Sequence, residues 1–387
     1  MYRLALVGLI GLQLSMVSPC LAQTEAQYRD DALSIERTVN TQYAYLDRFP
    51  DGVMPMSDTL RAEAQAVKDA RSLLKYAEHA LFSLADHHAI TGRSFADDWA
   101  IVPSYSDLWI EKSGNDFVVE AVRPSSPAAA AGIRPGDHLT AIDDVDVNVA
   151  VARFWGELEL PVTDENAAFA VRTMAAGRRD RTRKLTLADA SGVERQLRLT
   201  NLYQDALERP RLSTFLEGET LVIRPNDSLG DNATIADFDE AMADAGDGQP
   251  IVIDLTDTPS GGNTVVARAI MGWFVSSPTA YQIHNLPSEE RQTGIPRQWI
   301  EQVLPRPSKH HRGPVSVRVG RWTGSMGEGL AIGFDALGAD VTGGRMAGLR
   351  GAVSDIALLN SGLVLKLPTE RLFTVDGVPR EDFIPSQ

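Results

Sequence analysis

A serine stands on a short turn between two contrasting runs of the chain. Ser325 follows the alternating run 315–319 (VSVRV), which predicts a buried strand, and precedes apolar residues whose spacing predicts a helix. A hydroxyl at a strand-to-helix turn is exposed, and backbone N–H groups at the helix N-terminus can stabilise an oxyanion. Residues 325–328 (SMGE) also fit the S-x-x-E pattern of an ordinary helix capping box. The local pattern leaves both interpretations open.

Two further groups of residues could act beside such a serine. Gly261 and Gly262 end a polar turn after the apolar run 251–255 (IVIDL), and a missing side chain lets the backbone approach a substrate carbonyl. His87 and His88 end a predicted helix, and a neutral imidazole is a competent general base near pH 7. Each group also has a structural interpretation, because glycines can begin the next helix and a histidine can interact with a helix end.

Composition limits the classes of function. With 387 residues the chain is too long for one typical core, so two or three domains are expected. The formal net charge of -15 argues against nucleic acid and anionic membrane surfaces as partners. The histidines lack the H-E-x-x-H spacing of a zinc site, so neither a metal nor another cofactor is expected.

The first 22 residues have the pattern of a secretory signal peptide. Arg3 precedes the apolar run 4–12, and the small residues Cys20 and Ala22 suit cleavage before Gln23. We therefore expect a periplasmic or secreted protein, without membrane insertion after cleavage, because no later stretch is long and apolar enough to span a bilayer. Cys20 is the only cysteine, so the mature chain would have no disulfide, thiol nucleophile or thiolate metal site.

The rest of the chain divides into three regions. Residues 23–96 carry apolar residues at helical spacing and predict a helical N-terminal region. Residues 97–203 predict mainly strands, and residues 204–387 alternate strands with helices. Within the last region, the polar and proline-containing stretch 281–314 predicts a lid or the wall of a cleft. The expected fold class is therefore a multidomain α+β protein with an α/β core.

The middle region resembles a PDZ domain. The strand-like run 117–122 is followed by Ser126-Pro127, by 132–137 (GIRPGD) and by a second strand-like run, 138–143. The glycine of GIRPGD can end a short helix and its Pro-Gly pair can form the turn. The resemblance implies that an extended peptide binds at a sheet edge near Leu108, Trp109 and Ile110, although the usual G-L-G-like loop signature is absent there.

The order of the regions resembles the S41 serine peptidases, the C-terminal processing and tricorn-core type. The family's D-L-R-x-N-P-G-G turn corresponds to 254–262 (DLTDTPSGG), and its G-E-R-T-F-G-K-G loop to 343–351 (GGRMAGLRG). Its S-A-S-E turn corresponds to 324–328 (GSMGE). The resemblance implies a crotonase-like peptidase core with Ser325 as nucleophile. Oxyanion donors would then come from Met326 and from Gly261 or Gly262.

One position departs from the processing peptidases, whose base is a lysine in the G-K-G loop. Here that position is Arg350, and an arginine does not lose its proton. The glutamine that supports the lysine is replaced by Ser354. The Ser–Lys mechanism therefore does not carry over. Arg350 and Glu328 are expected to support the site in other ways, Arg350 by holding a substrate carboxylate or the acidic residues of the tail.

The tricorn branch of the family implies a different base. Its D-x-H-T segment corresponds to 86–89 (DHHA), which makes His88 the expected base and His87 its substitute. That branch also orients its histidine with an acidic group near the C-terminus. Asp376 is the first candidate for this group, and Glu381 and Asp382 are the alternatives.

The resemblance thus implies a secreted or periplasmic serine endopeptidase that cleaves protein or peptide substrates. The PDZ domain would bind or gate the substrate chain, and a homo-oligomer is possible. The alternative is a catalytically inactive PDZ-containing scaffold or binding protein, favoured by Arg350 in the lysine position. Hydrogen-bond reach between the Ser325 hydroxyl and His88 or His87 would favour the enzyme.

Overall fold

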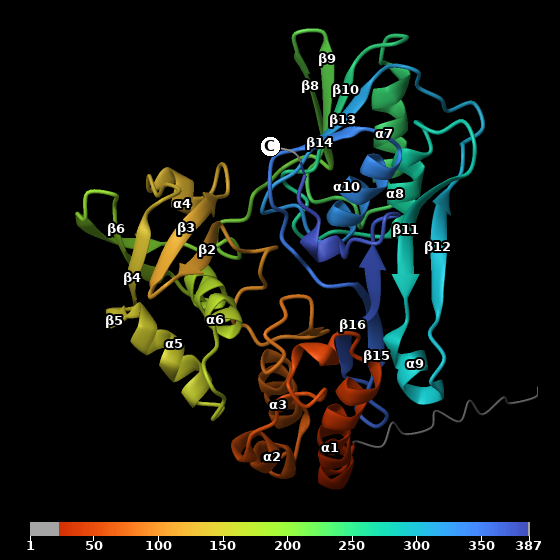
Figure 1. The fold of residues 1–387 in the computed structure, drawn as a ribbon. Coiled ribbons are helices and arrows are strands. Elements are labelled where there is room, and N and C mark those ends of the chain that lie inside the picture. Colours follow the sequence, from red (N-terminus) through yellow and green to blue (C-terminus); the bar gives the residue numbers. More distant parts are fainter. Residues whose placement is uncertain (1–22, 386–387) are drawn as a thin grey trace, which may run out of the picture.

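The computed structural model describes residues 23–385, so the predicted signal peptide lies outside the described residues. Three parts follow one another along the chain: a helical module, a small β-domain and an α/β core (Figure 1). This arrangement confirms the predicted α+β fold class. None of the helices in the described part of the chain is long and apolar enough to cross a membrane.

The helical module is built on three capped helices. They are α1 (Glu25–Gln42), α2 (Asp58–Gln65) and α3 (Ala70–Phe82), with a short 3-10 turn, η1 (Leu46–Arg48), between the first two. Their buried face includes Ile35 and Tyr76, which share one hydrophobic cluster with Leu365 and Leu367 from the far end of the chain. The module is therefore joined to the C-terminal part of the core.

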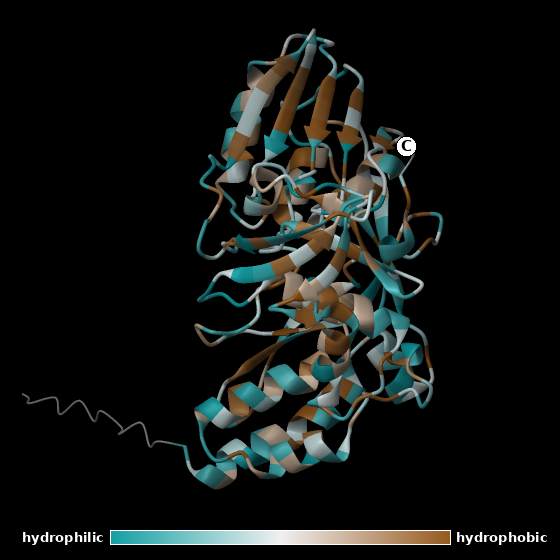
Figure 2. Ribbon diagram, turned by 90° about the vertical axis from the view of Figure 1, so that its left-hand side faces the viewer, coloured by the Kyte–Doolittle hydropathy of each residue, from teal (hydrophilic) through white to brown (hydrophobic). Residues whose placement is uncertain are grey.

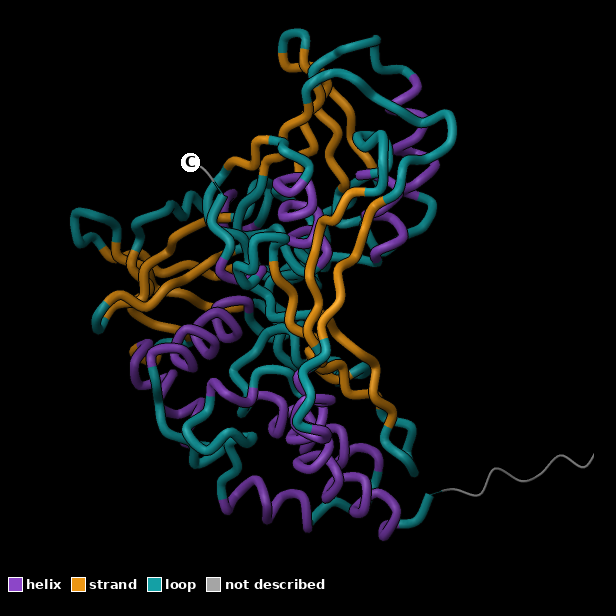
Figure 3. Tube along the Cα trace, turned by 45° about the vertical axis from the view of Figure 1, so that its right-hand side comes forward, coloured by secondary structure: helices purple, strands orange, loops and turns teal. Residues whose placement is uncertain are grey.

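A short strand after α3 fixes the histidine segment in space. Strand β1 (Ile90–Thr91) pairs antiparallel with β16 (Val364–Phe373), with Ile90 opposite Lys366. His88 lies two residues before β1, so this pairing carries it to the core. Figure 3 shows strands, in orange, running from the core down to the purple helices of the module.

The middle region forms a sheet in the order β2-β3-β4-β6-β7, with β5 paired to β4. Its strands are β2 (Leu108–Ser113), β3 (Asp116–Val122), β4 (His138–Ile142), β5 (Val145–Asp146), β6 (Arg183–Ala188) and β7 (Glu194–Leu199). The short helix α4 (Pro127–Ala130) is followed by Gly132, which has φ +72°, and then by the Pro-Gly turn. Two longer helices, α5 (Val147–Gly156) and α6 (Asp164–Ala176), were not predicted.

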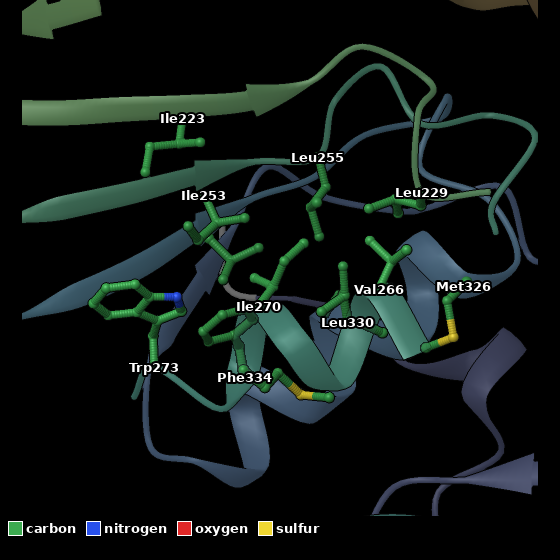
Figure 4. Close-up of a cluster of buried hydrophobic side chains, with 14 of the residues drawn as sticks. Ile223, Leu229, Ile253, Leu255, Val266, Ile270, Trp273, Met326, Leu330 and Phe334 are labelled. Carbon is green, nitrogen blue, oxygen red and sulfur yellow. The ribbon is translucent and has the colours of Figure 1, made fainter. Parts of the chain in front are cut away.

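The core contains a sheet in the order β14-β13-β10-β9-β8, parallel except for β8. Its strands are β8 (Leu212–Glu217), β9 (Thr220–Pro225), β10 (Ile251–Asp254), β13 (Val315–Arg318) and β14 (Asp340–Thr342). Helices α7 (Thr234–Ala243), α8 (Thr264–Met271) and α10 (Met326–Ala336) accompany it. The sheet strands carry hydrophobic residues, brown along the ribbon in Figure 2, and their buried side chains pack against α8 and α10 (Figure 4).

Two neighbouring strands of this sheet lead into the candidate turns. Strands β10 and β13 are parallel partners, with Asp254 opposite Arg318. Their carboxyl ends therefore meet at one edge of the sheet, which is where open α/β sheets place their ligands. The turn that contains Gly261 and the turn that contains Ser325 follow these two ends, and each is anchored on the other by the hydrogen bond from Gly324 N to the carbonyl of Thr258 (3.2 Å).

The second core sheet gives regular structure to much of the stretch 281–314, whose role as a lid or the wall of a cleft stays a prediction. Strands β11 (Thr279–Asn285) and β12 (Gln298–Val303) form an antiparallel pair joined through α9 (Pro287–Thr293). The sheet has the order β1-β16-β11-β12, and β15 (Ala352–Ala357) also pairs with β16. Strand β12 lies at the edge with alternate residues exposed, which explains why its sequence reads as polar.

A substitution at Leu367 tests the hydrophobic packing between the helical module and the core. Its side chain is fully buried in the shared cluster, so Leu367→Ala should leave a cavity and lower the free energy of unfolding by about 2–5 kcal/mol. Leu359→Ala is the matched control, since Leu359 is 93% exposed. Urea denaturation of both variants measures the effect. Equal stability of the two variants would contradict this packing of the module against the core.

Candidate active site

Ser325 occupies a constrained backbone position at the start of α10. Its φ of 51° and ψ of -112° are unusual for a residue with a side chain and belong to a sharp strand-to-helix turn. Such a conformation persists only where neighbouring contacts fix it. Here the Ser325 N–H donates to Glu328 Oε2 at 2.8 Å, so the capping box predicted from the sequence is present. The same turn thus provides the cap and holds the half-buried Ser325.

The structure brings Ser325 and His88 together. The Nε2 atom of His88 lies 3.0 Å from Ser325 Oγ, and its Nδ1 atom lies 2.7 Å from the carbonyl oxygen of Arg350. Because a carbonyl only accepts hydrogen bonds, Nδ1 must carry the ring proton. The lone pair on Nε2 is then free to accept the serine proton.

An acidic residue supports His88 from its own segment. Asp86 is buried, and its Oδ1 accepts the backbone N–H of His88 at 2.9 Å. Its Oδ2 accepts from the hydroxyl of Tyr43 at 2.7 Å, which ties the segment to the helical module. Sequence reasoning did not select Asp86 as a site residue, although it is the first residue of the D-x-H motif.

The surroundings of His88 favour the neutral ring. Burial lowers its pKa from 6.5 to about 4, and the positive charge of Arg380 contributes to this net shift. The hydrogen bond to the Arg350 carbonyl and the charge of Asp86 oppose this shift without reversing it. At pH 7 the imidazole is therefore unprotonated and able to accept a proton.

His87 faces a different environment. Its ring stacks on Phe169 of α6 at 4.4 Å, and its Nε2 is buried without a hydrogen-bond partner among residues 23–385. Burial, followed by the charges of Arg172 and Arg350, holds its pKa well below the usual value. Of the two histidines, only His88 therefore hydrogen-bonds to Ser325 within the described chain.

The structure does not bring the predicted tail carboxylates to His88. Asp376 is exposed and lies beside Asp335, whose pKa is raised by burial and then by the charge of Asp376. Glu381 is half-buried and lies beside Tyr45. Burial, and then the charge of Glu381, raises the pKa of Tyr45. Asp382 is exposed. The prediction of Asp376 as the orienting acid is wrong for this geometry. Its place at Nδ1 is taken by a backbone carbonyl.

The two glycines are required for different reasons. At Gly261, which has φ +65°, an added Cβ would lie 2.4 Å from Ser325 Cβ and 2.7 Å from Met326 N. At Gly262 it would lie 2.1 Å from the backbone of Leu229. Gly261 thus keeps open the space beside the serine and the Met326 N–H, where a substrate oxygen would need to lie. Its own N–H donates to the Thr258 carbonyl at 3.2 Å.

The side chain of Arg350 points to the PDZ-like region. Its Nη2 lies 2.6 Å from Glu165 Oε1 on α6, and Arg48 of the helical module binds the same oxygen at 2.7 Å. The side chain therefore forms an ion pair between domains. The expectation that it holds an acidic residue of the tail is wrong, and the expectation that it holds a substrate carboxylate stays a prediction. What Arg350 contributes to His88 is its backbone carbonyl.

The predicted peptide-binding stretch is covered. Leu108, Trp109 and Ile110 are at most 1% exposed. The guanidinium of Arg172 from α6 stacks over Trp109 at 4.5 Å, and its Nε donates to the carbonyl of Ile110 at 2.9 Å. Their side chains are therefore packed: Trp109 lies in a cluster with Trp322, Ala347 and Leu349 of the core, and Leu108 and Ile110 belong to the core of the PDZ-like region. Strand β2 is nevertheless the edge strand of its sheet, so peptide binding near it stays a prediction.

A cavity of about 380 Å³ lies between α6, β2 and the loop that carries Arg350. Its lining includes Glu111, Glu165, Phe169, His87 and Leu349. The cavity thus lies between the PDZ-like region and the loop that carries Arg350, next to the His88 segment, but neither Ser325 nor His88 lines it. A group of three or more histidine or acidic residues able to hold a metal ion does not occur in the described chain.

Glu328 carries a prediction about pH. It is fully buried and accepts the N–H groups of Ser325, Gly348 and Leu349 (2.8, 2.8 and 3.2 Å). Burial raises its pKa from 4.5 to about 7, although Arg380 and these donors oppose the rise. Between these two values the folded chain keeps a proton that the unfolded chain has lost, so stability falls as pH rises.

The variant Glu328→Gln removes this titration. The free energy of unfolding of the wild type, relative to the variant, should decrease by about 3 kcal/mol from about pH 4.5 to about pH 7. Urea denaturation of both proteins across this range measures the difference. A difference that stays constant with pH would contradict the raised pKa.

Comparison with known proteins assigns the two larger parts of the chain. Residues 118–154 match the family model of the PDZ domain, and residues 212–382 match that of peptidase family S41. No curated protein sequence matches the chain.

Two solved structures share the fold at low sequence identity. Mature CPAF in complex with lactacystin is 15% identical with a TM-score of 0.56, and the alignment covers 93% of each chain. The photosystem II D1 C-terminal processing protease is 16% identical with a TM-score of 0.57, covering 93% of this chain and 92% of that one. By these matches, the chain combines a PDZ domain at residues 118–154 with a peptidase core of the S41 type at residues 212–382.

Proposed function

We propose that this peptidase is a serine endopeptidase that forms an acyl-enzyme on Ser325 with His88 as general base. The observation that carries the proposal is the 3.0 Å contact between Ser325 Oγ and a His88 ring whose Nδ1 is held by a carbonyl. A nucleophile hydrogen-bonded to an oriented base is the arrangement that nucleophilic catalysis requires. It replaces the Ser–Lys pair that Arg350 rules out.

The reaction follows from these contacts. His88 Nε2 takes the Ser325 proton as Oγ bonds to the carbonyl carbon of the scissile peptide, and the carbonyl oxygen becomes an oxyanion. The backbone N–H groups of Met326 and Gly262 donate to that oxygen. The imidazolium then gives its proton to the leaving amine, so the peptide C–N bond breaks. A water molecule, deprotonated by the same ring, later hydrolyses the ester and restores Ser325.

Protein or peptide chains are the substrates that a peptidase core and a PDZ domain suggest. We assign the PDZ domain a role in holding or gating the substrate chain, supported by the cavity it shares with the loop 347–350. The predicted signal peptide, residues 1–22, supports a periplasmic or secreted location. A PDZ-containing binding protein without catalysis is the second candidate, favoured by Arg350 in the lysine position. The hydrogen bond between Ser325 and His88 argues for the enzyme instead.

Proteolysis of unfolded casein tests the proposal. Ser325→Ala and His88→Ala should each lower kcat/KM by about 10³-fold or more, because the nucleophile and the base act as a unit. His87→Ala is the matched control, since this neighbouring ring stacks on Phe169 instead. Its activity should stay within about threefold of the wild type. Equal cleavage by wild type and Ser325→Ala would overturn the proposal, and labelling by a fluorophosphonate at Ser325 gives a readout independent of substrate choice.

The pH profile of kcat/KM tests the state of His88. Its pKa of about 4 in place of 6.5 means that the base stays unprotonated in mildly acidic solution. Activity should therefore persist at about pH 5.5, and the acidic limb should follow an apparent pKa well below 6.5. A limb centred near the usual histidine pKa would contradict the assigned environment.

A further inference from the structure

We infer that Arg380, in the C-terminal tail, is a positioning residue that orients His88 through the backbone carbonyl of Arg350. In a Ser–His–Asp triad a carboxylate does this directly. Here the tail contributes a guanidinium, and the group that touches the ring is a peptide oxygen. The inference rests on the proposed roles of Ser325 and His88.

Arg380 holds the carbonyls on both sides of Arg350. It begins the 3-10 turn η2 (Arg380–Asp382) and is only 3% exposed. Its Nη2 donates to the carbonyl of Leu349 at 2.8 Å and to the carbonyl of Gly351 at 2.9 Å. Because peptide units are planar, fixing both neighbouring carbonyls leaves the peptide between them little freedom. The Arg350 carbonyl is thereby aimed at His88 Nδ1.

The backbone at Gly351 depends on this arrangement. Its φ is +54°, and an added Cβ would lie 2.0 Å from the carbonyl oxygen of Glu370. The chain therefore passes close to β16 directly after the carbonyl that accepts from His88. A loop in such a conformation needs contacts that hold it, and the guanidinium of Arg380 supplies two of them.

Glu328 holds the same loop from its N–H side. It accepts from Gly348 and Leu349, and also from the backbone N–H of Ser325. Its Oε2 lies 3.8 Å from Arg380 Nη2, and the side chains of both residues are at most 3% exposed. These two buried side chains thus hold the nucleophile turn and the acceptor of the base in a single framework. Above about pH 7, where Glu328 is ionised, each buried charge also depends on the other, because a buried charge without its partner is costly.

A residue that only anchored the tail would differ from this in a measurable way. The charge of Arg380 also acts on His88, where it disfavours the imidazolium. Replacing it with a neutral residue should raise the pKa of His88. Both carbonyl contacts come from one atom, Nη2, so a lysine, a strongly hydrated point charge on a flexible stem, should keep the charge but hold the two carbonyls less rigidly. Charge and geometry can therefore be tested separately.

The experiment compares Arg380→Met, Arg380→Lys and the matched control Arg297→Met, since the Arg297 side chain is 57% exposed and pairs with Glu289. We expect Arg380→Met to lower kcat by about 10- to 100-fold with KM nearly unchanged, and to move the acidic limb of kcat/KM to higher pH. Arg380→Lys should keep the wild-type limb and still lose kcat by about fivefold or more. Arg297→Met should resemble the wild type in kcat.

NMR of ¹⁵N-histidine-labelled protein gives a readout that needs no turnover. The His88 ring should titrate at higher pH in Arg380→Met than in the wild type, and near the wild-type pH in Arg380→Lys. Should Arg380→Met fail to fold, the lysine variant alone decides. Wild-type kcat in Arg380→Lys, or an unchanged limb and titration in Arg380→Met, would overturn the inference. If the proposed function itself were wrong, the result would be different: the wild-type protein would neither cleave casein nor be labelled at Ser325 by a fluorophosphonate.

Discussion

The hydrogen bond from His88 Nδ1 to the carbonyl of Arg350 determines what the rest of the site can do. It fixes the ring proton on one nitrogen and turns the other toward Ser325. A carbonyl does not ionise, so the orientation of the ring is independent of the protonation of any acid. It also stabilises an imidazolium less than a carboxylate would, and the charge of Asp86, bonded to the backbone of His88, partly makes up for this.

Long-range strand pairings position the histidine segment and the two turns of the site. The pairing of β1 with β16 brings the histidine segment to the core, while the parallel pair β10 and β13 sets the glycine turn beside the serine turn. The PDZ domain reaches the same point, because Glu165 binds Arg350 and Arg48 together. Trp322 just before the serine turn donates to the Ser106 carbonyl at 2.8 Å. The site is thus the meeting point of all three parts of the chain.

Local turn chemistry in the sequence predicted the parts of the site that depend on short motifs. Ser325 at a strand-to-helix turn and the glycines opposite it are examples, since their constraint lies within a few residues. The acceptor of His88 Nδ1 could not be found this way, because every residue has a carbonyl and no side-chain pattern marks one. Arg380 was passed over for the same reason: an acid was expected from the tail. Helix α6 was missed because its burial, including Phe169, comes from tertiary packing.

Ser325 and its partner histidine are separated by 237 residues along the chain. During synthesis the histidine segment is made well before the serine, the Arg350 carbonyl and Arg380. The hydroxyl therefore meets the imidazole only after β16 has paired with β1 and the tail has folded onto the loop. A nascent or partly folded chain thus holds no assembled site.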